Sequence, residues 1–411
     1  MKFDTLVLGA GIVGVSTALH LQKQGRAVAL IDHKTPGIET SFGNAGLIQR
    51  EGVYPYAFPR DAASLMRYAR NTALDVRYHA NAMSSAAPFL AKYWYHSEAK
   101  RHAAIARAYS TLIAHCVSEH RSLASEANGT QFLRSSGWIK VFRTAAFQDQ
   151  EIRAVERWQR EYGVGFEVLD QPRLQQVEPD LDHSLLGGLR YIDADSVSDP
   201  KGLLDAYLSY FQKLGGRLLK GDASTLKGDW TVTTEEGDVS AASVVVALGP
   251  WSKNLTDRLG YRLPLGVKRG YHMHYAAGDN RKLTHPVLDA ENGYMLAPMD
   301  RGIRLTTGAE IARPNAPKTP VQLDAVEPIA RTLMPLGQRL DAEPWMGRRP
   351  CTPDMMPVIG PASRHKGMWF AFGHAHHGLT LGPVTGRLIA EMMTGKATLV
   401  DARPFRVERF E

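Results

Sequence analysis

Two arginines and three histidines in the C-terminal part of the sequence are the side chains best suited to chemistry on a small molecule. Arg348 and Arg349 precede a proline-rich loop, and the stretch GHAHHG at residues 373–378 places the three histidines within four positions. A guanidinium group binds a carboxylate through two parallel hydrogen bonds, and imidazole changes its charge near neutral pH. These residue types predict a site for a carboxylated substrate, with histidine nearby to move a proton. The alternative for either arginine is a surface ion pair.

The histidine spacing is also compatible with a metal site. No acidic or cysteine partner lies at ligand spacing near His374, His376 and His377, however, and the pattern HExxH is absent from the sequence. We therefore expect no metal here. The flanking glycines favour another interpretation, because Gly373 ends an apolar run and Gly378 opens a helical pattern. Such a turn lets the backbone pass close to a ligand.

The N-terminus carries a second candidate binding site. Gly9, Gly11 and Gly14 form the pattern GxGxxG directly after an apolar run and at the start of a helical pattern. The first two glycines permit a tight turn and close approach to a pyrophosphate, and the third permits close packing of helix on strand. Asp32 ends the next strand, AVALID, where a carboxylate can accept hydrogen bonds from a ribose. The pattern predicts dinucleotide binding; the alternative is a structural glycine-rich turn.

Two further stretches rich in small residues follow predicted strands. ETSFGNAG at residues 39–46 offers polar side chains at Thr40, Ser41 and Asn44, and VVVALGPW at residues 244–251 ends a buried strand at Gly249. Small residues at the carboxyl end of a strand allow a ligand to lie against the backbone. A surface loop would have a similar composition, so each signal is weak alone.

Composition restricts the class of protein. The 411 residues suggest two or three domains, and a net charge of +7 without dense basic runs argues against a nucleic-acid arm. The positive excess favours anionic small ligands or weak attraction to an anionic membrane. With Cys116 and Cys351 alone, a disulfide framework is excluded and a reducing compartment is favoured. We expect a cytoplasmic protein without a secretory signal, and peripheral contact with the inner face of a membrane stays open.

The elements that must position these residues form two groups. Residues 3–32 read as strand, turn, helix and strand, the start of a parallel sheet, and the last 50 residues again read as strand, turn and helix. Residues 263–311 read as extended segments separated by Gly, Pro and Asp, typical of an antiparallel sheet. Residues 60–130 read as helices that cover another part of the chain. The predicted fold class is α/β, with a Rossmann-like domain assembled from separated segments and an α+β domain with an antiparallel sheet.

The order of the motifs resembles a known family. GxGxxG, TSFGNAG, VVVALGPWS, RRPCTPDMMPVIG and FGHAHHGLTLGPVTGRLIAEMM together look like the FAD-dependent D-amino acid dehydrogenase and glycine oxidase family, the D-amino-acid oxidase-like flavoproteins. The likeness runs from residue 4 to about residue 396 and is weakest in the helical segment. It implies an FAD-binding domain formed by residues 1–60, 148–256 and 338–411, and a substrate domain formed by 61–147 and 257–337.

The resemblance also assigns roles to residues. Arg349 matches the arginine that binds the substrate carboxylate, and His376 or His377 is expected at the substrate. Ala223 matches a backbone contact on the adenine side, and Cys351 lacks the spacing used for covalent attachment, so non-covalent FAD is expected. The cofactor-binding residues implied are Gly9, Gly11, Ile12, Val13, Gly14, Asp32, His33, Thr40, Ser41, Asn44, Ala45, Gly46, Leu47, Ala223, Gly249, Gly373, His374, Gly378, Leu379 and Thr380.

The implied reaction is oxidation of a Cα–N bond, with hydride transfer from the α-carbon to flavin N5 to give an imino acid. The implied substrates are D-amino acids or cyclic imino acids, with D-proline or a hydroxyproline epimer favoured. Electrons would pass to a quinone or to oxygen. The alternatives are an oxygen-using glycine, sarcosine or opine-type oxidase, or an NAD-dependent oxidoreductase.

Overall fold

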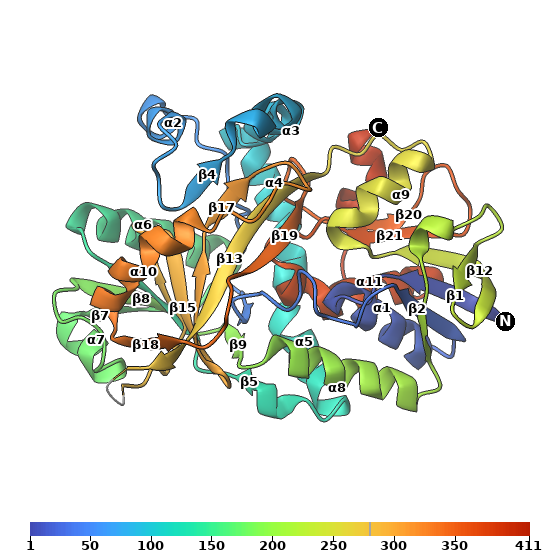
Figure 1. Ribbon diagram of the computed structural model, residues 1–411, viewed down its shortest axis with the longest axis horizontal. Coiled ribbons are helices and arrows are strands. Elements are labelled where there is room, and N and C mark those ends of the chain that lie inside the picture. The colour runs from blue at the N-terminus through green and yellow to red at the C-terminus, as the bar shows by residue number, and fades with distance from the viewer. Residues whose placement is uncertain (279–280) are drawn as a thin grey trace.

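The computed structural model describes residues 1–278 and 281–411. Two large sheets define two lobes that lie side by side, and both chain termini lie in the same lobe (Figure 1). The predicted α/β fold class, with a Rossmann-like lobe and an α+β lobe with an antiparallel sheet, is confirmed. Among the described residues, no helix has the length and apolar character needed to cross a membrane.

The first lobe is built on a mainly parallel sheet of seven strands. Its strand order is β10 (Arg217–Lys220), β2 (Val28–Asp32), β1 (Lys2–Leu8), β12 (Gly237–Val246), β21 (Met368–Phe372) and β20 (Val358–Pro361), with β11 (Thr231–Thr234) also paired to β12. Parallel neighbours need crossover connections, and here the crossovers contain whole segments of the other lobe. The separated assembly expected from the sequence is therefore observed.

Glycines allow the helices of this lobe to pack closely. Helix α1 (Ile12–Lys23) lies beside α11 (Gly378–Met393), and α8 (Pro200–Lys213) also packs on α1. A Cβ on Gly14 would lie 1.8 Å from the carbonyl oxygen of Gly9, and one on Gly386 would lie 2.6 Å from the backbone of Ser16. Neither position has room for a side chain, so the glycines fix how near strand and helices come.

The second lobe is built on an eleven-stranded sheet around the long strand β13 (Gly266–Ala277). Along the main path the strands are β4 (Val76–Tyr78), β17 (Ala309–Ile311), β13, β16 (Gly302–Thr307), β15 (Tyr294–Met299), β14 (Val287–Asp289), β6 (Trp138–Phe142), β8 (Gly187–Tyr191) and β7 (Phe166–Asp170), while β18 (Leu336–Arg339) and β19 (Trp345–Cys351) also pair with β13. The segment expected to form extended strands does so, and its strands β13, β15 and β16 pair antiparallel.

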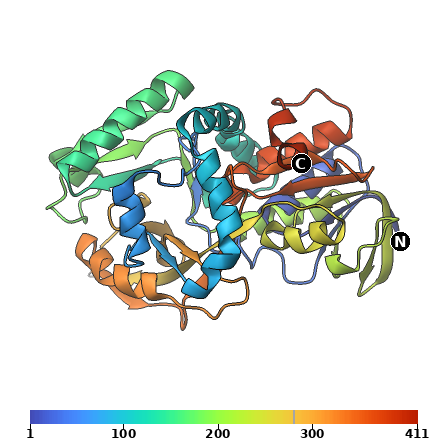
Figure 2. The same ribbon diagram turned by 90° about the horizontal axis from the view of Figure 1, so that it is seen from above.

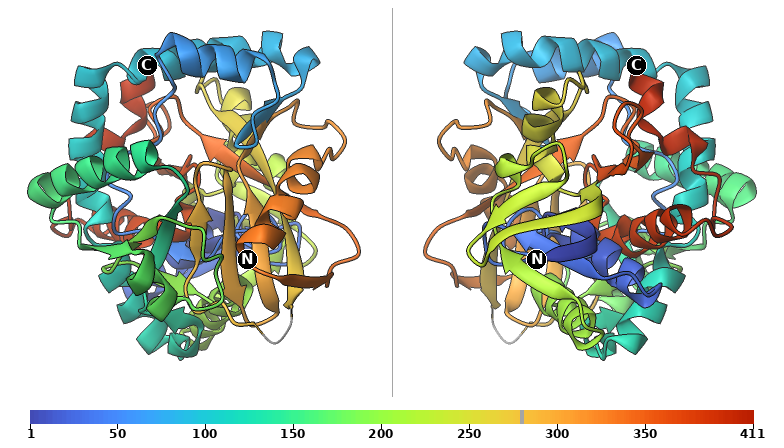
Figure 3. Two further views of the ribbon diagram at one scale, coloured as in Figure 1. Left: turned by 90° about the vertical axis from the view of Figure 1, so that its left-hand side faces the viewer. Right: turned by 90° about the vertical axis from the view of Figure 1, so that its right-hand side faces the viewer.

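Helices cover both lobes. Helices α6 (Ala145–Tyr162), α7 (Gln171–Val177) and α10 (Val321–Leu333) pack on the second sheet, and α9 (Ser252–Arg258) follows β12. Helices α4 (Ala99–Ile113) and α5 (Cys116–Glu126) pack on α11 instead. Helices α2 (Ala62–Ala69) and α3 (Met83–His96) form the top of the molecule, with α3 crossing between the lobes (Figures 2 and 3). A small sheet of β3 (Leu47–Ile48), β9 (Asp195–Val197) and β5 (Leu133–Arg134) joins distant segments.

The strand pairing divides the chain differently from the domain boundaries that the resemblance implied. Strands β7 and β8 lie within 148–256 and strand β19 lies within 338–411, yet all three belong to the second sheet. Helices α4 and α5, within 61–147, pack on the first lobe. The physical reason is that membership of a sheet depends on which strand edge offers hydrogen bonds, not on proximity in sequence.

Candidate active site

A cavity of about 850 Å³ lies between the lobes and is lined by residues of both. One end, here called the Rossmann end, is formed by Gly9, Gly11, Asp32 and their neighbours at the carboxyl ends of β1 and β2. In open parallel sheets, ligands bind in this position. The cavity also reaches β13 and β19, so a ligand at the Rossmann end and a second molecule at these strands would share one partly closed cavity.

At the Rossmann end, side chains from the end of β2 and from the loop after it accept hydrogen bonds from the glycine-rich turn. Asp32 Oδ2 accepts a hydrogen bond from the backbone N–H of Ala10 at 2.7 Å, and Ser41 Oγ accepts one from Ile12 N–H at 3.0 Å. Gly9 has φ +104°, a left-handed conformation that disfavours any side chain. The three features fix a narrow turn whose backbone faces the cavity.

Two helix N-termini face the cavity, and their geometry fits a dinucleotide. Helix α1 begins after Gly11, which has no side chain to cap the helix, although its first N–H, that of Ile12, donates to Ser41 Oγ. Helix α11 begins at Gly378 with no side-chain cap from His377. Gly11 and Gly378 both line the cavity. A helix N-terminus presents unpaired N–H groups and partial positive charge, which favour an anion. The α1 end therefore suits a pyrophosphate, and the α11 end suits a group that gains negative charge.

A buried arginine that sequence reasoning missed supports the loop beside the cavity. Arg304 of β16 donates hydrogen bonds from Nη1 to the backbone carbonyls of Phe42, at 3.0 Å, and of Asn44. Its Nε donates to Nε2 of His274 at 3.0 Å, and His274 Nδ1 bonds Asp341 Oδ2 at 2.7 Å. Asp341, His274 and Arg304 thus form a chain that holds the loop in place.

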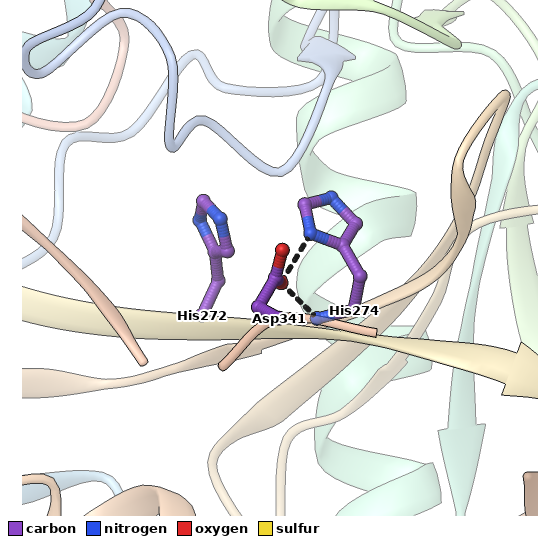
Figure 4. A group of neighbouring side chains, drawn as sticks. All are labelled: His272, His274 and Asp341. Carbon is purple, nitrogen blue, oxygen red and sulfur yellow. Dashed lines mark hydrogen bonds and ion pairs between the residues drawn. The ribbon is translucent and has the colours of Figure 1, made fainter. Parts of the chain in front are cut away.

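The same region contains a group with metal-ligand spacing. Candidate ligand atoms of His272, His274 and Asp341 all lie within 4.8 Å of one another (Figure 4). Two cations already bind this group, because Arg304 occupies His274 Nε2 and Arg301 pairs with Asp341 Oδ1 at 2.7 Å. Positive charge beside the ligands opposes a third cation. We interpret the group as part of the support for the loop.

The part of the cavity beside β13 and β19, here called the cationic end, contains Arg349. Its Nη1 donates to the carbonyl of Gly308 at 2.7 Å and its Nη2 to that of Thr307 at 3.1 Å. The guanidinium lies over Gly270, where a Cβ would be 2.5 Å from Nη2. Burial lowers the pKa of Arg349. Its contacts leave it without a carboxylate partner among the described residues, and it faces the cavity, as a carboxylate-binding residue must.

His376 lies beside Arg349 at the cationic end. It lines the cavity, and its ring lies 4.7 Å from that of Tyr56 between centroids. Burial lowers the pKa of His376 well below its usual value, and the nearby His377, Arg349 and Lys268 lower it further. The imidazole is therefore neutral at neutral pH and acts as a hydrogen-bonding group rather than a cation.

His377 does not reach the cavity, which corrects its expected place at the substrate. Its Nδ1 bonds the hydroxyl of Tyr109 at 2.6 Å, and the two rings stack at 5.8 Å. The reason is burial: His377 is 1% exposed, lies behind His376 with ring centroids 3.8 Å apart, and is held by Tyr109 of α4. His374 lines the cavity and bonds Thr385 at 2.9 Å through Nε2, consistent with a structural role.

The other residues implied to bind the cofactor divide into two sets. Those that line the cavity are Gly9, Gly11, Ile12, Val13, Asp32, His33, Thr40, Ser41, Asn44, Ala45, Leu47, Gly249, His374, Gly378 and Leu379. Gly14, Gly46, Ala223, Gly373 and Thr380 do not line it. Gly14 and Gly46 are packed against backbone, and Thr380 bonds the carbonyl of Leu47 at 3.1 Å, so these two glycines and Thr380 shape the cavity walls from behind.

Comparison with known proteins gives the family. Residues 4–392 match the family described as DAO, FAD dependent oxidoreductase. Relatives include a D-amino-acid oxidase of Bradyrhizobium diazoefficiens, 28% identical with 98% of each chain covered. A D-amino acid dehydrogenase of Sinorhizobium medicae is 29% identical, with 98% of this chain and 99% of the relative covered.

Solved structures share the fold. Glycine oxidase from Geobacillus kaustophilus superposes with a TM-score of 0.76 at 22% identity, over 99% of this chain and 98% of the other. L-proline dehydrogenase from P. horikoshii superposes with a TM-score of 0.74 at 19% identity, over 100% of this chain and 99% of the other. The family match confirms the predicted FAD cofactor and replaces the NAD-dependent alternative. The chain belongs to the DAO family of FAD-dependent oxidoreductases.

Proposed function

We propose that this enzyme oxidises the Cα–N bond of a D-amino acid or of a cyclic imino acid such as D-proline or a hydroxyproline epimer. The observation that carries the proposal is Arg349, a guanidinium group that faces the cavity with no carboxylate partner among the described residues. An unpaired cation in a partly closed site is costly unless an anionic ligand joins it. The α-carboxylate of an amino acid meets that requirement.

The names of the relatives support this substrate class. Those reported above are called D-amino-acid oxidase and D-amino acid dehydrogenase, and the L-proline dehydrogenase with the same fold acts on a cyclic imino acid. These names belong to proteins less than 30% identical to this chain. They favour an amino or imino acid as substrate and leave its configuration and side chain to experiment.

The chain's own residues bind and orient the substrate. Arg349 holds the α-carboxylate, and because two hydrogen bonds to Gly308 and Thr307 fix the guanidinium, the carboxylate is held in one orientation. Correct orientation of reacting groups is worth on the order of 7 kcal/mol or more at best. Neutral His376 is placed to accept a hydrogen bond from the substrate nitrogen and to assist loss of its proton.

FAD, when bound, supplies the acceptor for a hydride from the α-carbon. Loss of that hydride and of one proton from nitrogen turns the C–N bond into C=N, giving an imino acid. The two electrons leave the enzyme with oxygen or a quinone as the final acceptor. The N-terminus of α11 faces the cavity and stabilises negative charge that develops there.

Anaerobic reduction of the holoenzyme tests the proposal. The purified protein is expected to be yellow, and its absorbance near 450 nm is expected to fall when D-amino acids or cyclic D-imino acids are added. The panel includes D-proline, hydroxyproline epimers, glycine, sarcosine and the L-enantiomers. His376→Ala, measured in parallel, is expected to react more slowly. A yellow protein that no member of the panel reduces would contradict the proposal. Peroxide production compared with quinone reduction then identifies the electron acceptor.

A further inference from the structure

Lys268 is a second cation in the cavity wall, and sequence reasoning did not single it out. Strands β13 and β19 pair antiparallel with Lys268 directly opposite Arg349. Directly opposed residues of an antiparallel pair project from the same face with Cβ atoms about 4.5–5.5 Å apart. Both side chains line the cavity. Lys268 Nζ lies 4.2 Å from the centroid of the Tyr93 ring, which provides a weak, uncharged partner.

Among the residues that the structure describes, no acidic side chain neutralises this pair of cations. Within residues 1–278 and 281–411, neither Lys268 nor Arg349 forms an ion pair with a carboxylate. Burial lowers the pKa of Lys268, and the adjacent Arg349 lowers it further. Two positive groups side by side repel each other in a partly closed cavity, so both need anionic ligands.

The acidic residues that line the cavity lie elsewhere and already have partners. They are Asp32, which accepts the Ala10 N–H at 2.7 Å, Glu39, which pairs with Lys34, and Asp75, which pairs with Arg67 at 2.8 Å. None of them belongs to β13 or β19. The compensating negative charge must therefore come from a bound molecule.

We propose that Lys268 and Arg349 together select amino or imino acids that carry a second anionic group. Arg349 binds the α-carboxylate, and Lys268 binds a carboxylate on the side chain. This inference rests on the proposed function and narrows it. It predicts that short dicarboxylic amino acids such as D-aspartate and D-glutamate are better substrates than amino or imino acids with neutral side chains, such as D-proline. The Tyr93 ring lies against the Lys268 ammonium group and leaves its charge unneutralised.

Paired substrates of equal shape provide the kinetic test. D-Glutamate and D-glutamine differ in charge but hardly in size, as do D-aspartate and D-asparagine. Wild-type holoenzyme is expected to show a lower KM for the acid of each pair. Lys268→Met removes the ammonium group and keeps the chain length, and should raise KM for the acids by about ten- to a hundredfold while changing KM for the amides little. Lys268→Arg should preserve the preference, and Lys366→Met controls for loss of one exposed surface charge.

Binding of unreactive acids gives a second readout. Glutarate and butyrate cannot be oxidised at a Cα–N bond, and titration calorimetry with the FAD-loaded enzyme measures their affinity directly. Glutarate is expected to bind more tightly than butyrate to wild type, and Lys268→Met should abolish the difference. Far-UV circular dichroism and the flavin spectrum confirm that each variant is folded and loaded.

The outcomes separate this inference from the proposed function. Equal KM values for acids and amides in wild type would overturn the inference and leave the function standing. An equal rise in KM for acids and amides in Lys268→Met would also overturn it, since Lys268 would then hold the shared α-carboxylate. If no amino acid reduces the flavin, the proposed function fails. In that case the glutarate and butyrate affinities still decide whether the cavity binds two anionic groups.

Discussion

Gly270 shows how one missing side chain positions a functional group. The guanidinium of Arg349 lies where a Cβ on this residue would stand, 2.5 Å from Nη2. Trp345 lies over Gly347 in the same way, with a Cβ there only 2.3 Å from the indole. Both glycines lie on the face of the β13–β19 pair that carries Lys268 and Arg349. Glycine at these positions leaves room for large side chains to lie flat along the sheet.

Gly270→Ala is therefore expected to displace Arg349 without removing it. The guanidinium must move away from the carbonyls of Thr307 and Gly308, and KM for amino acids should rise about tenfold while kcat changes less. Steady-state kinetics with the best substrate of the panel measures the effect. Gly228→Ala is the matched control, because a Cβ there meets nothing within 4 Å. Unchanged KM in Gly270→Ala would show that Arg349 tolerates the shift or does not bind substrate.

For single residues, the sequence predicts a place in the site only where the residue belongs to a short local motif. Gly9, Gly11 and Asp32 belong to one compact pattern, and Arg349 was found through the order of the motifs. Lys268 carries no comparable signal, because a strand residue shows neither its face nor its partner until the register is known. Its pairing with Arg349 joins residues far apart in sequence. His377 shows that a local motif can also mislead: it is adjacent in sequence to His376, yet His376 lines the cavity and His377 does not.

Among the elements, the loop of residues 42–44 depends on a strand from the other lobe. Arg304 is 4% exposed, and burial lowers its pKa to about 10. It holds the carbonyls of Phe42 and Asn44 while His274 and Asp341 hold it in turn. One lobe thus fixes the shape of a loop that lines the cavity from the other.

Arg304→Met should loosen this loop and weaken FAD binding. Three hydrogen bonds from a charged donor are lost, and the carbonyls of Phe42 and Asn44 lose a partner. FAD affinity is expected to fall at least about tenfold, measured by fluorescence titration of the apoprotein. Arg301→Met removes a neighbouring, exposed cation of the same network and serves as control. Equal FAD affinity in wild type and Arg304→Met would contradict this role.

The sequence predicted the kinds of elements well and their partners poorly. The strand, turn and helix around Gly9 and around Gly373 follow from local glycine and apolar patterns, and both are present. Strands β7, β8 and β19 were expected in the first lobe but join the second sheet. The support given by Arg304 was invisible, because an arginine on a strand resembles a surface residue until its burial is known.

For the molecule as a whole, buried neutral histidines predict loss of stability in acid. Burial lowers the pKa of five histidines to values between about 2 and about 4; they are His20, His120, His272, His374 and His377. In the unfolded chain each titrates near pH 6.5. Below that pH the unfolded state binds protons that the native state does not, so the free energy of unfolding decreases as pH falls. Their contribution is fully present only above about pH 6.5.

One buried carboxyl group opposes this trend. Burial raises the pKa of Glu51 to about 7, so between about pH 4.5 and 7 it is protonated in the native state and ionised in the unfolded state. It therefore stabilises the fold as pH falls through that range. It offsets about one of the five histidines, and the net effect remains a loss of stability in acid.

The midpoint of urea unfolding of the holoenzyme is thus expected to fall steadily from pH 7 to pH 5. His120→Gln should make this decrease shallower by about one proton, worth about 1.4 kcal/mol per pH unit. Glu51→Gln should make it steeper by a similar amount. A midpoint that is constant across this range would contradict the assignment of neutral buried histidines.

The interleaving of the two lobes has a consequence for biosynthesis. Val7 of β1 pairs with Val245 of β12, and α1 packs against α11 near the C-terminus. Ribosomes add about 5–20 residues per second, so the apolar strand β1 waits on the order of ten seconds or more for its second neighbour. During that time its edge is open to other nascent chains. We therefore expect synthesis to expose the edge of β1 to non-native pairing until β12 has been made.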